Sequence, residues 1–179
     1  MMQFSTISQN DTDLIVQLYK DSFSEAEGPE EGAAIAKLVR SLLAEEELES
    51  IIGFVAADQQ GLEAAIIFSP LSFAKGDAGF LLSPVAVRSK TQGQGIGSRL
   101  IRHGLEALKA QGHDIVFTYG DPAYYSRFGF VAVSHEKVVA PYPLSMPVGW
   151  LAVSLKGDDV TKLEGRLQCV RAFDNPDLW

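Results

Sequence analysis

The chain has 179 residues, of which 46% are apolar and 21% charged, and its 15 Lys+Arg against 23 Asp+Glu give a formal charge of −8. That length and apolar content predict one compact domain over residues 1–179 and exclude an intrinsically disordered chain. The acidic balance argues against a nucleic-acid or anionic-membrane partner, but it leaves room for a local site that binds a small anion.

The chain has few residues that could bind a metal or form a disulfide, which is typical of an intracellular protein without a metal. A lone cysteine, Cys169, cannot form an intrachain disulfide, and the three histidines at positions 103, 113 and 135 are scattered. No apolar run approaches the roughly 18–20 residues that span a bilayer, and the first residues show no signal-peptide pattern. We therefore expect a cytoplasmic protein without a metal and without a membrane partner.

The first third of the chain predicts a strand and two helices. Met2–Ile7 is a short strand, and apolar residues at helical spacing predict a helix over 11–23. The next stretch, Ser24–Gly32, contains Gly28, Pro29 and four glutamates, and it interrupts the pattern. A second helix is predicted from Ile35 to Glu45–Glu47.

The pattern then changes to that of strands. Ser50–Ala57 and Leu62–Ser69 flank a turn at 58–61, which is typical of a hairpin, and Gly79–Val87 predicts a third strand. An amphipathic helix follows from Ile96 and ends near Gly112.

The last part of the chain predicts shorter elements. Asp114–Tyr119 and Phe130–Val133 are predicted strands that flank a short helix at Pro122–Phe128. Two late strands are predicted at Trp150–Leu155 and Arg166–Phe173. The whole pattern predicts one α/β domain without internal repeats.

A glycine-rich turn, Gln92-Gly93-Gln94-Gly95-Ile96-Gly97, lies where a predicted strand enters a helix. Glycines adopt positive φ, and the first helical turn has unpaired N–H groups, so such a turn can bind phosphate. A P-loop has Lys followed by Ser or Thr after its last glycine, whereas Ser98-Arg99 follow Gly97 here. The turn is therefore not a P-loop. A dinucleotide fingerprint fails as well, because Ser98 stands where its third glycine belongs. A plain strand-to-helix turn is the alternative interpretation.

Two motifs together resemble the GNAT superfamily of N-acetyltransferases. Val85-Ala86-Val87 leading into Gln92-x-x-Gly95-x-Gly97 is similar to its acyl-CoA motif, and Tyr125-x-x-x-Gly129-Phe130 is similar to its second signature. The longer string over 120–130 looks like a bacterial subgroup of predicted acetyltransferases. The resemblance implies an α/β (α+β) fold, with a mixed, mostly antiparallel sheet splayed near Val85–Val87 and helices on both faces.

The resemblance also implies roles for particular residues. Acetyl-CoA is the expected acyl-donor substrate. The strand edge at 85–87 pairs with its pantetheine amides and polarises its carbonyl, while the backbone N–H groups of the turn hold its pyrophosphate. The residues expected to bind it are Val85, Ala86, Val87, Gln92, Gly93, Gln94, Gly95, Ile96, Gly97 and Ser98.

Tyr125 matches the position of the general acid that protonates the departing thiolate. Unperturbed pKa values of ~10 for tyrosine and ~8.5 for a thiol make that transfer uphill by only about 2 kcal/mol. The general base is left open, because the predicted strand at 79–87 contains no acid. His135, Glu31 and a water relay are the alternatives.

The expected function is transfer of an acetyl group from acetyl-CoA to a primary amine of a small molecule or peptide, by direct attack in a ternary complex. The glutamates between the first two helices and the stretch Pro141–Pro147 are candidates to border the acceptor. A non-catalytic acyl-CoA sensor is the main alternative, and a nucleotide-dependent oxidoreductase is a weaker one. The acceptor, the acyl-chain preference and the oligomeric state stay open.

Overall fold

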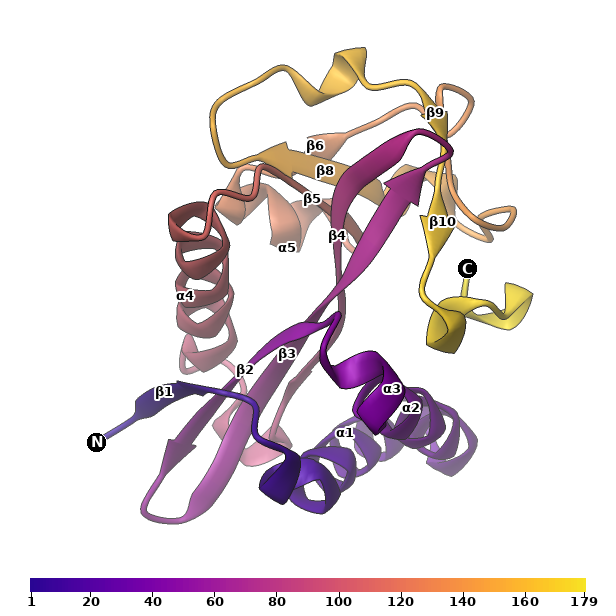
Figure 1. Ribbon diagram of the computed structural model, residues 1–179. Helices are drawn as coiled ribbons and strands as arrows, with labels where there is room; N and C mark the ends of the chain where they lie inside the picture. Colours follow the sequence, from indigo (N-terminus) through magenta and orange to yellow (C-terminus); the bar gives the residue numbers. More distant parts are fainter. The chain divides into compact units, whose positions relative to one another are not determined.

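The computed structural model describes the backbone of residues 1–179 and all side chains except those at 45 and 46 (Figure 1). It divides into two compact units, residues 1–68 with 84–104 and residues 69–83 with 105–179. Two strands and one helix contribute residues to both units. No helix in the described part of the chain is both long enough and apolar enough to cross a bilayer.

The first unit contains an antiparallel set of three strands. β1 (Gln3–Thr6) pairs with β2 (Ile52–Asp58), which pairs with the first part of β3 (Gly61–Phe73). The predicted turn at 58–61 is confirmed, with Gly61 at a φ of 123°. The chain also bonds to β3 just after the following strand ends, because the Arg88 N–H donates to the Glu63 carbonyl at 2.8 Å.

Helices α1 (Thr12–Glu27) and α2 (Pro29–Leu42) are separated by a single residue, Gly28, whose φ is 101°. The predicted interruption is therefore confirmed at Gly28, but it does not extend over 24–32. Pro29 fits the first helical position, and Glu30 and Glu31 favour the first turn because they carry charge opposite to the helix N-terminus. The glutamates thus extend two helices and form no loop. A short helix, α3 (Glu45–Leu48), follows.

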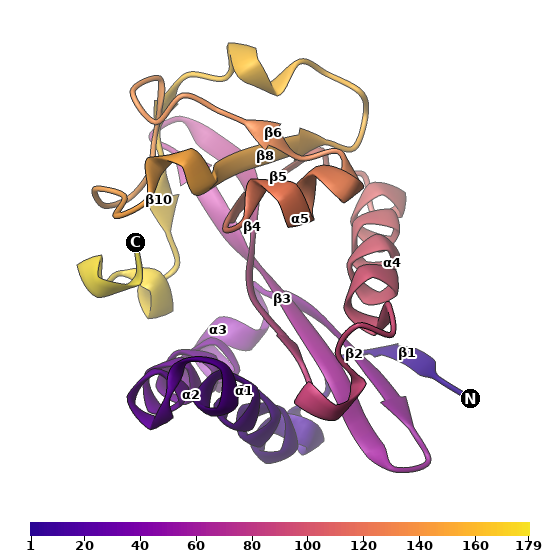
Figure 2. The same ribbon diagram turned by 180° about the vertical axis from the view of Figure 1, so that it is seen from behind.

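Helix α4 (Ile96–Ala110) covers one face of the three strands, and α1 and α2 lie on the other face (Figures 1 and 2). On the α4 side, His103 packs against Phe4 and Phe54, with ring centroids 5.4 and 5.2 Å apart. His103 is therefore half-buried between two aromatic rings. Helices on both faces are confirmed.

The second unit contains a mixed sheet. β4 (Gly76–Val87) pairs in parallel with β5 (Ile115–Tyr119), and β5 pairs antiparallel with β8 (Trp150–Ser154). The shorter strands are β6 (Val131–Ala132) antiparallel to β8, β10 (Gln168–Cys169) antiparallel to the end of β3, and a separate parallel pair of β7 (Val138–Val139) with β9 (Gly165–Arg166).

The pairing between β4 and β5 ends well before β4 does. It runs from Phe80 opposite Val116 to Leu82 opposite Thr118, whereas β4 continues to Val87. Pro84, just past the last pair, has no N–H to give to a neighbouring strand. The expected opening of the sheet therefore begins directly after Leu82.

The late segment Arg166–Phe173 is not the single strand that was predicted. β9 pairs with β7, β10 pairs with β3, and a 3₁₀ helix covers Arg171–Phe173. The chain changes its pairing partner at Leu167, so no continuous alternation extends through this segment.

Gly79 holds β4 close to β5, and its replacement tests this packing. Its φ is 144°, and a Cβ atom there would overlap the Ile115 carbonyl. We expect Gly79→Ala to lower the free energy of unfolding by about 2–4 kcal/mol in urea titration. Gly157→Ala is the matched control, because Gly157 has a φ of 88° and open space around it. It should cost about 1 kcal/mol, and equal losses in both variants would contradict the overlap.

Candidate functional site

The glycine-rich turn and the first residues of α4, over 92–98, form a cradle of backbone N–H groups that could hold an anion. Gly93 and Gly95 have φ values of 78° and 75°, which only glycine adopts without strain. Residues 92–95 are exposed, while Ile96 and Gly97 are buried where the helix begins. The first-turn N–H groups have no partners within the helix, so they are available to a bound phosphate.

A buried carboxylate, Glu63 on β3, anchors the chain just before this cradle. It is 1% exposed and accepts a hydrogen bond from the Thr91 hydroxyl at 3.0 Å. Lys90 Nζ lies 3.4 Å and Arg88 Nε 3.8 Å from its other oxygen. One carboxylate therefore fixes the 3₁₀ helix Ser89–Thr91 and holds two cations beside the turn. Sequence reasoning missed Glu63, although a lone acid inside the apolar run 62–69 was a visible signal.

Side chains from α1 and from the turn bind the final residues of β4. The Tyr19 hydroxyl donates to the Pro84 carbonyl at 2.8 Å, and the Ser22 hydroxyl donates to the Val87 carbonyl at 2.9 Å. The Gln92 amide also donates to the Val87 carbonyl, at 3.0 Å. The predicted strand edge at 85–87 and the predicted turn are thus joined directly. The Gln92 side chain has a role in positioning this edge.

Tyr125 lies at the end of a short helix in the second unit, α5 (Pro122–Tyr125), which is capped by the Asp121 side chain accepting from the Ala123 N–H at 2.9 Å. Its ring packs edge-on against Phe130, with centroids 5.6 Å apart. A Cβ atom on Gly120 would come within 2.7 Å of the Tyr125 ring. Glycine at position 120 therefore leaves the space that this ring fills.

The Tyr125 hydroxyl is hydrogen-bonded to Thr118, whose own hydroxyl donates to the Leu82 carbonyl at 2.9 Å. Tyr125 therefore lies at the last pair of the β4–β5 ladder. Burial raises the pKa of Tyr125 to about 12, and the hydrogen bond with Thr118 lowers it in part. The phenol is fully protonated at neutral pH, as an acid catalyst requires.

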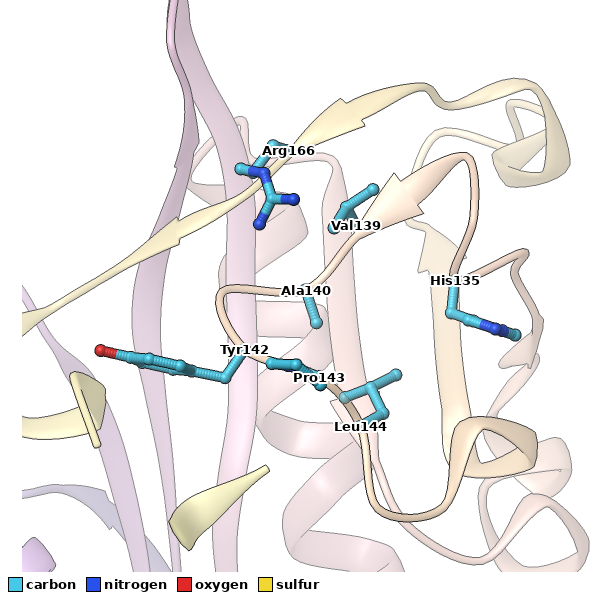
Figure 3. A pocket seen from close by; sticks show the side chains of 7 residues that line it. All are labelled: His135, Val139, Ala140, Tyr142, Pro143, Leu144 and Arg166. Carbon is cyan, nitrogen blue, oxygen red and sulfur yellow. The ribbon is translucent and has the colours of Figure 1, made fainter. Parts of the chain in front are cut away.

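The candidate bases lie in different surroundings. Glu31 is half-buried in the first turn of α2, and His135 is exposed. Figure 3 shows His135 beside a cavity of about 120 Å³ whose wall includes Tyr142, Pro143 and Leu144. In the same view the Arg166 side chain extends toward Ala140, and His135 lies on the other side of the cavity.

The observed β4 begins earlier than predicted and so includes an acid, Asp77, which is exposed and lies eight residues before Val85. The positions of Glu31, His135 and Asp77 do not single out one of them as the general base.

Cys169 is half-buried on β10, and burial raises the pKa of its thiol to about 11. A protonated thiol is a poor nucleophile, so Cys169 does not fit an acyl-enzyme mechanism. Among the described residues, no group of three His, Cys, Asp or Glu side chains could hold a metal ion.

Comparisons with known proteins agree with this geometry. Residues 38–132 match the family model of the acetyltransferase (GNAT) domain. The chain is 35% identical over 141 residues to the uncharacterized N-acetyltransferase YjhQ of Escherichia coli (strain K12), covering 75% of this chain and 77% of YjhQ.

Two solved structures have the same fold over 97% of this chain. One is the GNAT family N-acetyltransferase YhbS from Escherichia coli in complex with CoA, at 29% identity, with a TM-score of 0.82 and 92% of its chain covered. The other is a GNAT family acetyltransferase from Brucella melitensis in complex with acetyl-CoA, at 28% identity, with a TM-score of 0.75 and 99% covered. The cradle at α4, the opened strand pair and these matches together establish that the chain belongs to the GNAT superfamily of N-acetyltransferases.

Proposed function

We propose that this protein transfers an acetyl group from acetyl-CoA to a primary amine of a small molecule or peptide, by direct attack in a ternary complex. The observation that carries the proposal is the cradle at residues 92–98, which is exposed over 92–95 and which Glu63 anchors at the start of α4. Similar chains have been solved with CoA and with acetyl-CoA bound. The acidic net charge of −8 favours a cationic amine over a nucleic acid as the second substrate.

The donor is held by backbone groups. The N–H groups of the first turn of α4 bind the pyrophosphate, which a helix N-terminus favours, whereas the Gln92 and Gln94 N–H groups already donate to the Ser89 and Thr91 carbonyls. The edge of β4 at Val85, Ala86 and Val87 pairs with the pantetheine amides, and one of its N–H groups polarises the thioester carbonyl. This role of the edge is supported by its fixed position, because the Ser22 and Gln92 side chains both donate hydrogen bonds to the Val87 carbonyl.

The reaction then needs one proton to leave and one to arrive. The neutral amine nitrogen attacks the carbonyl carbon, and the tetrahedral intermediate collapses as the carbon–sulfur bond breaks. The nitrogen loses a proton, and the thiolate takes one from Tyr125. The hydrogen bond to Thr118 supports this role, because it fixes the Tyr125 hydroxyl at the last pair of the β4–β5 ladder.

We also propose that residues 1–179 act as one domain, and that the reaction takes place in the cytoplasm. The first proposal rests on β3, β4 and α4, each of which contributes residues to both compact units. The second rests on the single unpaired cysteine.

Acetyl-CoA should stabilise the purified protein. At 100 times its Kd it should add about 2.7 kcal/mol to the free energy of unfolding and raise Tm by several degrees. NADH is the control nucleotide and should cause no shift. Gly95→Ala should weaken acetyl-CoA binding, because its φ of 75° strains any other residue, whereas Gly157→Ala should not. A shift with NADH alone would contradict the proposal.

Tyr125→Phe should lower kcat by 10²- to 10⁴-fold and leave the Kd for acetyl-CoA unchanged, because only proton transfer is lost. Tyr124→Phe is the matched control, since its ring packs on that of Tyr125 with centroids 5.1 Å apart. Release of free thiol measures both variants. If the wild-type protein binds acetyl-CoA and acetylates no amine in a broad library, the sensor interpretation replaces this one.

The raised pKa of Tyr125 predicts a loss of stability at alkaline pH. In the unfolded chain the phenol ionises near pH 10, whereas in the folded protein it ionises near 12. Its contribution is therefore complete below pH 10 and is lost as pH rises toward 12, by about 2–3 kcal/mol. Urea unfolding at pH 8, 10 and 11 should show a smaller decline for Tyr125→Phe than for wild type. Parallel declines would show that the phenol is solvated.

A further inference from the structure

The cavity in Figure 3 lies within the second unit and contains none of the residues assigned to acetyl transfer from the cradle, β4 or α5. Its volume is about 120 Å³, and it is open to solvent on one side. The residues that line it come from the segment 135–144 and from Arg166 on β9. Its ligand is therefore a question of its own, which the donor does not answer.

The walls of this cavity are mostly apolar and are held in place by distant parts of the unit. The Leu167 N–H donates to the Val139 carbonyl at 2.8 Å, which joins β9 to β7. The Trp150 indole N–H donates to the Val138 carbonyl at 3.0 Å. The apolar side chains that line the cavity are those of Val139, Ala140, Pro143 and Leu144. A wall that is already fixed before binding loses little freedom when a ligand arrives.

Arg166 brings a guanidinium without a partner to this apolar wall. It pairs with Val139 across β7 and β9, and paired residues of neighbouring strands have their side chains on the same face. Figure 3 shows the Arg166 side chain extending over Val139 toward Ala140. Its guanidinium has no hydrogen bond or ion pair with any residue that the structure describes. A guanidinium presents its N–H groups as a fork that matches the two oxygens of a carboxylate.

The other polar side chains of the lining do not oppose an anion. Among the described residues that line the cavity, none is acidic. The Tyr142 hydroxyl donates its proton to the Asp174 carboxylate at 2.7 Å, so this proton is already engaged. His135 is exposed on the other side of the cavity, and an imidazole ring can donate a hydrogen bond. The lining thus favours an anion over a cation.

We propose that this cavity binds a small monocarboxylate whose apolar body is one ring or a branched alkyl group. The carboxylate pairs with Arg166, and the apolar body lies against Val139, Ala140 and Leu144. An enclosed apolar cavity of about 150 Å³ holds one benzene molecule, so 120 Å³ with an open side accepts most of one ring. Because the ion pair stays in contact with water, the charge and the apolar body each contribute modestly, and the ligand needs both.

Four compounds separate the two contributions. Cyclohexanecarboxylate has the charge and the ring, cyclohexanecarboxamide lacks the charge, cyclohexylmethylammonium reverses it, and acetate lacks the ring. We expect the Kd of cyclohexanecarboxylate to be about threefold to tenfold below that of each of the others. Equal or tighter binding of any of the other three overturns the proposal.

Nuclear magnetic resonance of isotope-labelled protein measures these Kd values and locates the site. The backbone amide signals of Val139, Ala140, Leu144 and Arg166 should move as cyclohexanecarboxylate is added, because these residues line the cavity. Signals that move only in other parts of the chain, or no movement at all, overturn the proposal.

Arg166→Gln should raise the Kd of cyclohexanecarboxylate by about threefold to tenfold and leave that of cyclohexanecarboxamide unchanged, because only the partner of the charge is lost. Arg171→Gln is the matched control, since Arg171 is exposed near the C-terminus and does not line the cavity, and it should change neither Kd. Equal weakening of the acid and the amide in Arg166→Gln would show that Arg166 is only structural, and would overturn the ion pair.

This inference does not rest on the proposed acetyl transfer, because all of these measurements are made without acetyl-CoA. A protein that binds cyclohexanecarboxylate at this cavity and fails to bind acetyl-CoA overturns the proposed function alone. A protein that binds acetyl-CoA and shows no preference for the acid overturns the carboxylate site alone.

Discussion

The hydrogen bond from the Thr118 hydroxyl to the Leu82 carbonyl, 2.9 Å long, marks the point at which β4 and β5 stop pairing. Beyond it β4 continues to Val87, while β5 ends at Tyr119. A strand that runs on without this neighbour presents backbone groups that must find other partners. Tyr19 and Ser22 satisfy two of its carbonyls. The remaining edge is what a substrate with amide groups would use.

A second constraint follows from charge. The chain carries a net charge of −8, yet the proposed role of its cradle is to hold an anion. The backbone supplies part of that attraction through glycine N–H groups and the helix N-terminus. Glu63 supplies another part indirectly, because its buried carboxylate keeps Arg88 and Lys90 beside the turn. An acid at the core thus arranges cations at the surface of an acidic protein.

The features that the sequence predicted well depend on local patterns. The turn at 58–61, the glycines of the cradle and the apolar stripe of α4 are all determined by residues close to one another in the chain. The break between α1 and α2 was misjudged, because a single glycine with a following proline ends one helix and begins another.

What the sequence did not reveal depends on distant partners. The Thr118 hydroxyl donates to the Leu82 carbonyl, 36 residues away, and the Thr91 hydroxyl donates to the Glu63 carboxylate, 28 residues away. No local sequence pattern indicates either pair. The strands near the C-terminus also depend on distant partners, since β9 pairs with β7 and β10 pairs with β3.

The raised pKa of Tyr125 bears on whether it can serve as an acid. Against a solvated thiol at ~8.5, a phenol at about 12 would face a gap of about 3.5 pKa units, or about 5 kcal/mol. A thiolate that is shielded from water is a stronger base, however, because burial disfavours its charged form. Cys169 illustrates the direction, because burial and, after it, the Asp174 carboxylate raise the pKa of its thiol to about 11. The exclusion of water that keeps Tyr125 protonated at rest would therefore also favour the proposed transfer of its proton to the thiolate.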